Sequence, residues 1–243
     1  MKKVFDGFAL SLSMLSILPF FKVHNFYKGI NGYAVTFYPF VGFLLGTLLF
    51  AIYELLLPYF PHFHLGVIVF ALWVLLTGAL HLDGLSDTID GLFVQKERAL
   101  EVMKDPHNGG MGMTFGAVFL ILKASSLISL DAFYLLPVVM LLSRLVVVFA
   151  ISKYPYVSPN GMSTLAKEEF TQTQLLTAFG YSLFVVYLFN AWLLFVAAFV
   201  SLFVIKAFFM KRYGGFTGDI YGFSIEVVEL ILLNCIIVGL VCK

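Results

Sequence analysis

Apolar runs long enough to cross a lipid bilayer recur along the whole of this sequence, and they constrain its fold more than any other feature. Of the 243 residues, 61% are hydrophobic and only 12% are charged, a balance that soluble domains do not have. A membrane-spanning helix needs about 20 predominantly apolar residues. We therefore expect an all-α, polytopic transmembrane helical bundle, with residues 1–243 forming a single integral membrane domain.

About seven spans are predicted, separated by short polar connections. They lie at 33–57, 65–82, 111–130, 132–152, 172–189, 191–210 and 220–242. A further apolar segment, 4–21, contains Asp6 and three serines and is closed by Pro19, so we expect an interfacial or re-entrant helix at the cytoplasmic leaflet. Bulky Phe20 and Phe21 follow where a signal peptide carries small residues, so we expect the segment to be retained.

Basic residues sort the connections by side. Lys and Arg gather in 21–32, 83–110, 153–171 and 211–219, whereas the connections near 58–64, 131 and 190 carry none. Basic loops face the cytoplasm, so we expect the first set of connections to be cytoplasmic. The net charge is +1 and there is no long basic run, which argues against a nucleic-acid partner.

The stretch GALHLDGLSDTIDGL, residues 78–92, carries three aspartates and no cation. In a helix, Asp83, Asp87 and Asp90 fall at i, i+4 and i+7, so their carboxylates share one face and repel one another. Mg²⁺, which prefers carboxylate oxygens, would supply the missing positive charge. The alternative is a solvated acidic helix start favoured by the helix dipole, which explains one or two aspartates rather than three over two turns. We expect His81 to orient a carboxylate rather than bind the ion.

The stretch RALEVMKDPHNGGMGM, 98–113, combines basic side chains with glycines at a predicted helix start, an arrangement that suits a phosphate. Its candidate residues are Arg98, Lys104, Asp105 and His107. The alternative is plain anchoring by positive charge, with Gly112 and Gly116 as a helix-packing face.

Two more connections lie on the same predicted side. The prolines of KYPYVSPNGM, 153–162, indicate a rigid connection. In RYGGFTGDIYG, 212–222, Asp219 either joins the metal site or caps the helix that follows.

Charges inside the predicted spans need partners. Arg144 lies about 12 Å from the cytoplasmic end of its span, where an unpaired charge is costly. Its candidate partners are a substrate phosphate or one of Glu226, Glu229 and Asp219, and a purely structural ion pair is the alternative. Lys123 is expected to lie nearer the outer surface and to snorkel towards it.

Taken in order, these blocks resemble the cobalamin synthase family, adenosylcobinamide-GDP ribazoletransferase, integral membrane enzymes of prokaryotes. The resemblance covers most of the chain and is carried by Leu18-Pro19, HLDGLSDTIDGL at 81–92, RALEVMKD at 98–105, Arg144, the PY-x-x-P-x-G loop at 155–161, and GGFTGD at 214–219 with Glu226 beyond it. The family commonly reads DSR where this chain has Asp105-Pro106-His107. It often has Arg at the position of Ser158, and both departures weaken a phosphate role for His107 and Ser158.

The resemblance implies the last assembly step of the cobalamin nucleotide loop. The family joins adenosylcobinamide-GDP to α-ribazole or α-ribazole 5′-phosphate, expels GMP, forms adenosylcobalamin or its 5′-phosphate, and needs Mg²⁺. It also implies the prokaryotic cytoplasmic (inner) membrane, with the active site facing the cytoplasm, and leaves a homo-oligomer open. The whole chain is then one catalytic domain.

These roles follow from the resemblance and the residues together. Asp83 and Asp87 are expected to hold Mg²⁺ on the diphosphate, and Asp90 is expected to be a third ligand or the general base. We expect one cytoplasmic cavity, large enough for a corrinoid, lined by Arg98, Lys104, Arg144 and Asp219, with His81 and Glu226 as supporting residues.

Two other functions remain open from the sequence. CDP-alcohol phosphotransferases have a similar aspartate layout, although their signature carries an Ala-Arg between its aspartate pairs. An ion-coupled transporter is the non-enzyme alternative, since intramembrane charges are ion ligands there. Transporters place such residues near the midplane in two related halves, whereas these aspartates lie at a helix end and the sequence shows no internal repeat.

Overall fold

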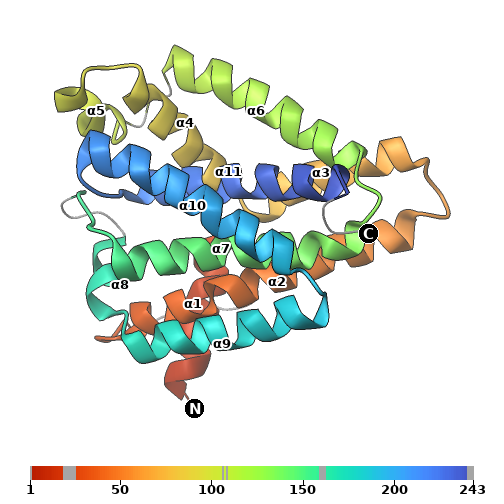
Figure 1. Ribbon diagram of the computed structural model, residues 1–243, viewed down its shortest axis with the longest axis horizontal. Helices are drawn as coiled ribbons and strands as arrows, with labels where there is room; N and C mark the ends of the chain where they lie inside the picture. Colours follow the sequence, from red (N-terminus) through yellow and green to blue (C-terminus); the bar gives the residue numbers. More distant parts are fainter. Residues whose placement is uncertain (1, 19–25, 106, 108, 159–162, 240–243) are drawn as a thin grey trace.

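The computed structural model describes residues 2–18, 26–105, 107, 109–158 and 163–239, and its regular structure in these ranges is helical (Figure 1). The expectation of an all-α bundle is confirmed. In chain order the helices are α1 (Lys2–Leu15), α2 (Ile30–Leu56), α3 (His62–Leu76), α4 (Leu80–Leu92), α5 (Lys96–Val102), α6 (Gly110–Ile128), the 3₁₀ helix η1 (Phe133–Leu135), α7 (Leu136–Lys153), α8 (Ser163–Glu169), α9 (Gln172–Leu188), α10 (Trp192–Tyr213) and α11 (Gly218–Ile237).

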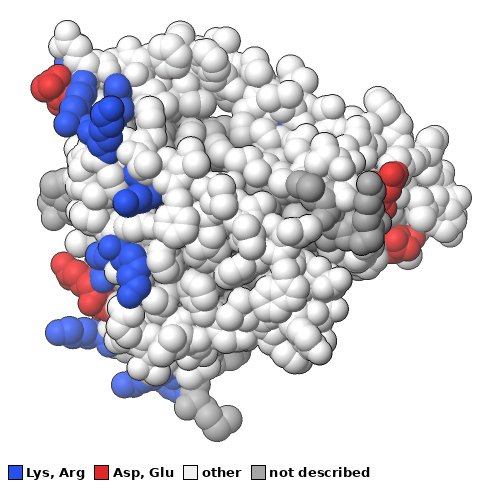
Figure 2. Space-filling model, in the orientation of Figure 1, with Lys and Arg blue, Asp and Glu red and all other residues white. Residues whose placement is uncertain are grey.

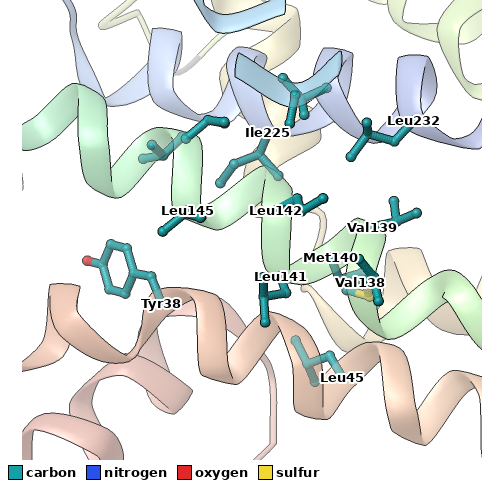
Figure 3. Close-up of a cluster of buried hydrophobic side chains, with 14 of the residues drawn as sticks. Tyr38, Leu45, Val138, Val139, Met140, Leu141, Leu142, Leu145, Ile225 and Leu232 are labelled. Carbon is teal, nitrogen blue, oxygen red and sulfur yellow. The ribbon is translucent and has the colours of Figure 1, made fainter. Parts of the chain in front are cut away.

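Helix α7 is the centre of the bundle. Almost all of its side chains are buried, and α2 and α11 pack on opposite sides of it (Figure 3). Leu141 and Leu145 lie with Tyr38 and Leu45 of α2, whereas Leu142 and Val139 lie towards Ile225 and Leu232 of α11. A helix that is apolar all round suits such a position, because every face meets another helix.

Five helices are long and apolar enough to cross a membrane, judged over the described residues: α2, α6, the continuous η1–α7 segment Phe133–Lys153, α10 and α11. The sequence predicted about seven spans. Helix α9, expected at 172–189, has 17 residues and is not among these five helices. The expected span 65–82 is instead the bent pair α3 and α4, so the number rises to six if that pair is one broken span.

The bend between α3 and α4 is 82° and comes from two left-handed residues. Gly78 has φ 60° and Ala79 has φ 54°, a conformation that glycine adopts readily and alanine rarely. The Thr77 hydroxyl donates to the Trp73 carbonyl at 3.0 Å and closes the end of α3. The bend turns the aspartate-bearing helix α4 away from the direction of α3.

Helix α1 packs against α2. Gly7 meets Tyr33 so closely that a Cβ there would overlap it, and the Phe8 and Phe37 rings contact edge to face with centroids 5.7 Å apart. The expected N-terminal segment 4–21 therefore forms a helix as far as Leu15. Its last residues, 19–21, lie outside the described residues.

Charged side chains divide between the two ends of the molecule. On the face shown in Figure 2, Lys and Arg gather along one end, near α5 and α8, with acidic side chains among them, whereas the opposite end shows acidic side chains without basic ones. This is the division expected from the basic and neutral connections of the sequence.

Candidate functional site

A cavity of about 670 Å³ lies where α4, α7 and α11 meet the loops before α6 and α8. Its volume falls within the ~300–1,000 Å³ usual for small-molecule sites. The lining includes His81, Asp83 and Gly84 of α4, Met103 and Lys104 after α5, Tyr156 and Ser158 before α8, Ser163 at the start of α8, Val147 and Ile151 of α7, and Asp219, Tyr221, Gly222 and Ile225 of α11.

Close packing of α4 on α11 brings two of the predicted aspartates to this cavity. Gly84 lies against the Asp219 backbone, and a Cβ added there would press on the Asp219 carbonyl. Gly222 lies in the same way against the backbone of His81. The absence of side chains at these two positions lets Asp83 and Asp219, 136 residues apart in sequence, line the same cavity.

Asp219 does not cap α11, which was one of its two expected roles. The cap is Thr217, whose hydroxyl accepts a hydrogen bond from the Ile220 amide at 3.2 Å and donates one to the Asp219 carboxylate at 3.2 Å. The Asp219 carboxylate is thereby oriented at the edge of the cavity.

The donor chemistry of this edge fits Mg²⁺. Asp83 is exposed, Asp87 is half-buried, and the Asp87 carboxylate lies within electrostatic range of Asp83, Asp219 and Asp90. In the described part of the chain, no three His, Cys, Asp or Glu side chains converge into a preformed metal site. Mg²⁺ does not require one, because it keeps several waters and uses one or two carboxylates together with substrate phosphates.

Asp90 lies away from the cavity lining, with only 7% of its surface exposed. Its two carboxylate oxygens accept hydrogen bonds from the backbone amides of Gly109, at 2.8 Å, and Gly112, at 2.7 Å. These amides are at the start of α6, where a phosphate was one of the two interpretations that the sequence left open. The protein's own carboxylate occupies that position. Gly112 and Gly116 were expected to form a helix-packing face. Gly112 packs closely against Ser86 and Asp90 of α4, whereas, outside its own turns of helix, no atom of the described residues lies within 4 Å of a Cβ placed at Gly116.

The predicted basic segment contributes one residue to the cavity. Lys104 lines it, whereas Arg98 is exposed on α5 and is not among the lining residues described. Asp105 accepts hydrogen bonds from the backbone amide and the ring of the exposed His107, at 3.0 and 2.8 Å. These bonds hold the pKa of Asp105 below its ordinary value, and neither residue lines the cavity.

Arg144 forms an ion pair within the bundle and is not exposed at the cavity. It is fully buried and pairs with Glu229, and its guanidinium also donates to the Ser143 hydroxyl at 2.8 Å. The expectation that it lines the cavity is wrong for the described residues, and the alternative of a structural ion pair is confirmed.

Lys123 joins the same cluster, so its expected snorkelling to the outer surface is also wrong. Its ammonium donates to Glu226 at 2.6 Å and to Glu229 at 2.5 Å, and lies 4.3 Å from the centroid of the Trp73 ring. The cluster is formed by side chains of three helices, α6, α7 and α11, and its two cations balance its two carboxylates. This charge balance limits the free-energy cost of burying the four groups. Glu226 is therefore a member of this ion-pair cluster and not a cavity residue.

His81 lies between the two regions. It lines the cavity and is 4% exposed, and both of its ring nitrogens lack a hydrogen-bond partner among the described residues. The charges of Arg144, Glu229 and Lys123 act on it. A residue that orients a carboxylate should hydrogen-bond to it. Among the described residues, His81 makes no hydrogen bond to Asp83 or Asp87.

Sequence reasoning missed a group of aromatic and hydroxyl side chains that also line the cavity. Tyr156, Ser158, Ser163 and Tyr221 form it, and three of them come from segments that the sequence identified only as connections. The signal was present in the tyrosines of YPY and DIYG, which lie in segments rich in proline and glycine that show no apolar periodicity.

Comparisons with known proteins identify the family of this chain. The family model described as cobalamin-5-phosphate synthase matches residues 7–237. The chain belongs to the cobalamin-5-phosphate synthase family. This membership leaves neither the CDP-alcohol phosphotransferase nor the transporter alternative standing.

Several relatives are named adenosylcobinamide-GDP ribazoletransferase. One from Thermosynechococcus vestitus is 39% identical over 83% of this chain and 84% of its own length. One from Desulfitobacterium hafniense is 37% identical over 81% of this chain and 83% of its own length. One from Acinetobacter baumannii is 34% identical over 96% of this chain and 97% of its own length. No solved structure matches this chain.

Proposed function

We propose that this protein is the membrane transferase that joins adenosylcobinamide-GDP to α-ribazole, or to α-ribazole 5′-phosphate, with release of GMP. The relatives' names give the donor and the acceptor class. The observation that carries the proposal to this chain is the meeting of Asp83, Lys104 and Asp219 at one cavity. A diphosphate substrate needs that combination of metal-binding carboxylates and a cation.

Asp83, which lines the cavity, and Asp87, which is not among the lining residues but interacts electrostatically with Asp83 and Asp219, would hold Mg²⁺ in this proposal. When bound, the ion neutralises charge on the diphosphate and on the departing phosphate. Both carboxylates belong to one helix face, one turn apart, so α4 presents them together.

The chain's own residues supply the other parts of the reaction. The hydroxyl oxygen of the acceptor forms a bond to the phosphorus that carries the cobinamide, the bond from that phosphorus to GMP breaks, and GMP leaves with the bonding electrons. Lys104 lies at the cavity and would stabilise charge on the non-bridging oxygens. Asp219 would accept the hydroxyl proton. We prefer it to Asp90, because both Asp90 oxygens already accept amide hydrogen bonds.

We further propose that the protein lies in the inner membrane of a prokaryotic cell and that its cavity opens to the cytoplasm. The motivation is the basic end of the molecule (Figure 2), since Lys and Arg are enriched on the cytoplasmic side of membrane proteins. Lys104 follows α5 and Lys167 belongs to α8, the two helices at that end of the molecule, whereas the connection at 58–64 carries no basic residue.

The test is reconstitution of the reaction. Purified protein in liposomes is incubated with adenosylcobinamide-GDP, α-ribazole and Mg²⁺, and GMP and the cobalamin product are measured by chromatography. The proposal requires equal molar amounts of both products, formed only when all three additions are present. A protein that is folded and monodisperse but forms neither product would overturn it.

A further inference from the structure

Four aromatic rings form a continuous stack that ends at the cavity. The ring centroids of Tyr154 and Phe216 are 5.4 Å apart, those of Phe216 and Tyr221 are 5.7 Å apart, and those of Tyr221 and Tyr156 are 6.1 Å apart. Adjacent planes differ by about 20°, from 18° to 21°. Only the last two rings, Tyr221 and Tyr156, line the cavity.

Backbone hydrogen bonds hold this stack in place. A parallel bridge joins Tyr156 to Phe216: the Val157 amide donates to the Phe216 carbonyl at 2.9 Å, and the Phe216 amide donates to the Pro155 carbonyl at 2.9 Å. The loops before α8 and before α11 are thereby fixed to each other. A ring held in this way is preorganised, so little side-chain freedom is lost when a ligand binds to it.

The cavity end of the stack is incomplete. Tyr156 is the terminal ring: among the described residues its one ring contact is with Tyr221. The Tyr221 side chain is 5% exposed, and its hydroxyl is buried without a hydrogen-bond partner within the described chain. Val147 and Ile151 of α7 add apolar side chains to the cavity lining.

We propose that the planar heteroaromatic base of a substrate stacks on Tyr156 as the next ring of this series, on the face of Tyr156 that Tyr221 does not cover. Flat bases bind aromatic side chains through their faces whatever their edge pattern. This inference rests on the proposed function, in which both substrates carry such a base: guanine in the GDP part of the donor and the base of α-ribazole in the acceptor. The acidic edge at Asp83 and Asp219 serves the phosphates, and Tyr156 serves the base.

The experiment measures binding rather than turnover. Dissociation constants for GMP and for α-ribazole are determined separately by calorimetric titration of the purified protein in detergent, for wild type, Tyr156→Leu and Tyr156→Phe. Stacking predicts that Tyr156→Leu weakens one of the two ligands about 10- to 100-fold and leaves the other within about 2-fold. Tyr156→Phe keeps the ring and should bind both ligands within about 3-fold of wild type. The ligand that is lost identifies the base: GMP for guanine, α-ribazole for the acceptor.

Tyr154→Leu is the matched control, because it removes a ring from the opposite end of the stack, away from the cavity. It should leave both dissociation constants within about 2-fold, and monodispersity on gel filtration is checked for every variant. The proposal is overturned if Tyr156→Leu alters neither dissociation constant or weakens both equally. It is also overturned if Tyr156→Phe or Tyr154→Leu weakens binding as much as Tyr156→Leu does. Failure of the proposed function looks different: wild type would bind both ligands and yet form no cobalamin in the reconstituted reaction.

Discussion

The Asp90 carboxylate accepts a hydrogen bond from the Gly112 amide at 2.7 Å, joining the end of the aspartate helix α4 to the start of α6. A second bond, from Gly109, uses its other oxygen. A buried carboxylate at a helix start gains from both the free amides and the helix dipole. Asp90 is thus chemically distinct from Asp83, although the two share a helix and a motif.

Replacing Asp90 should destabilise the protein more than replacing Asp83. Asp90→Asn turns an amide group towards a backbone N–H and loses about 1–3 kcal/mol. Asp83→Asn relieves repulsion between exposed carboxylates. We expect the melting temperature in detergent to fall by roughly 3–10 °C for Asp90→Asn and to stay within about 2 °C of wild type for Asp83→Asn. Equal melting temperatures for the two variants would contradict the capping role.

The buried ion pairs give a graded set of stabilities. Glu229 contacts both Arg144 and Lys123, whereas Glu226 contacts Lys123 alone. Glu229→Gln leaves two cations with one carboxylate and should cost about 3–5 kcal/mol. Glu226→Gln should cost less, because Lys123 keeps Glu229. Thermal unfolding in detergent gives the order, and the opposite order would show that the contacts are not those described.

Charge balance in the same cluster supplies a rescue experiment. The double variant Lys123→Met with Glu226→Gln removes one charge of each sign and leaves the Arg144–Glu229 pair intact. It should be more stable than Lys123→Met alone, since no carboxylate is then buried in excess. A double variant less stable than either single variant would mean that Lys123 stabilises the bundle through packing on Trp73 rather than through charge.

Acid should weaken the contact between α8 and the start of α2. Burial alone would raise the pKa of Glu169, but hydrogen bonds from the Gly29 amide, the Asn31 side chain and the amides of Asn31 and Gly32 outweigh it and hold the pKa below the ordinary value. The ionised form is therefore the stabilising one. Its contribution is present above the unfolded-state value of 4.5 and is lost as the pH falls through the lower folded-state pKa.

Glu169→Gln tests this dependence. The variant should melt below wild type at pH 7, and the difference should shrink as the pH falls below 4.5 and disappear once the pH is below the lowered folded-state pKa. Glu168→Gln, at the exposed neighbouring position, is the control and should show no such difference. A gap between wild type and Glu169→Gln that is independent of pH would contradict the assignment.

Labelling tests the proposed orientation. In a background with Cys235 and Cys242 replaced by serine, Tyr59→Cys at the non-basic end should react with a membrane-impermeant maleimide in intact spheroplasts. Lys96→Cys and Lys2→Cys should react only after permeabilisation. Reaction of Lys2→Cys in intact spheroplasts would place the N-terminus outside and reverse the expectation for α1.

The sequence predicted those features that depend on local periodicity. Seven apolar runs became helices near the expected residues, and the spacing of Asp83 and Asp87 placed them one turn apart on α4. The bend at Gly78 and Ala79 was not predicted, because a single apolar run continues through both residues and nothing in it requires a left-handed alanine. It divided one expected span into two helices.

Pairings between distant segments account for the other errors. Lys123 was interpreted from its depth in a span, and Arg144 was expected at the cavity, although Glu229 was one of its candidate partners. The surroundings of both are set by Glu226 and Glu229, which lie 85 to 106 residues away in the sequence. The surroundings of Asp90 are likewise set by a distant segment, since its partners are the Gly109 and Gly112 amides at the start of α6. The sequence showed which groups needed a partner. It did not show that the protein would provide partners for Arg144 and Asp90 and leave Asp83, Lys104 and Asp219 for a substrate.

The central claim is that Asp83 and Asp87 form the metal-dependent part of the transferase site, and turnover measured against Mg²⁺ concentration tests it most directly. Reconstituted Asp83→Asn and Asp87→Asn should insert normally and lose at least about 100-fold in turnover at saturating Mg²⁺, a loss of roughly 3 kcal/mol of transition-state stabilisation. If both variants keep near-normal, Mg²⁺-dependent transfer of the cobinamide phosphate to α-ribazole, the aspartates of α4 are not the catalytic metal site and the account fails.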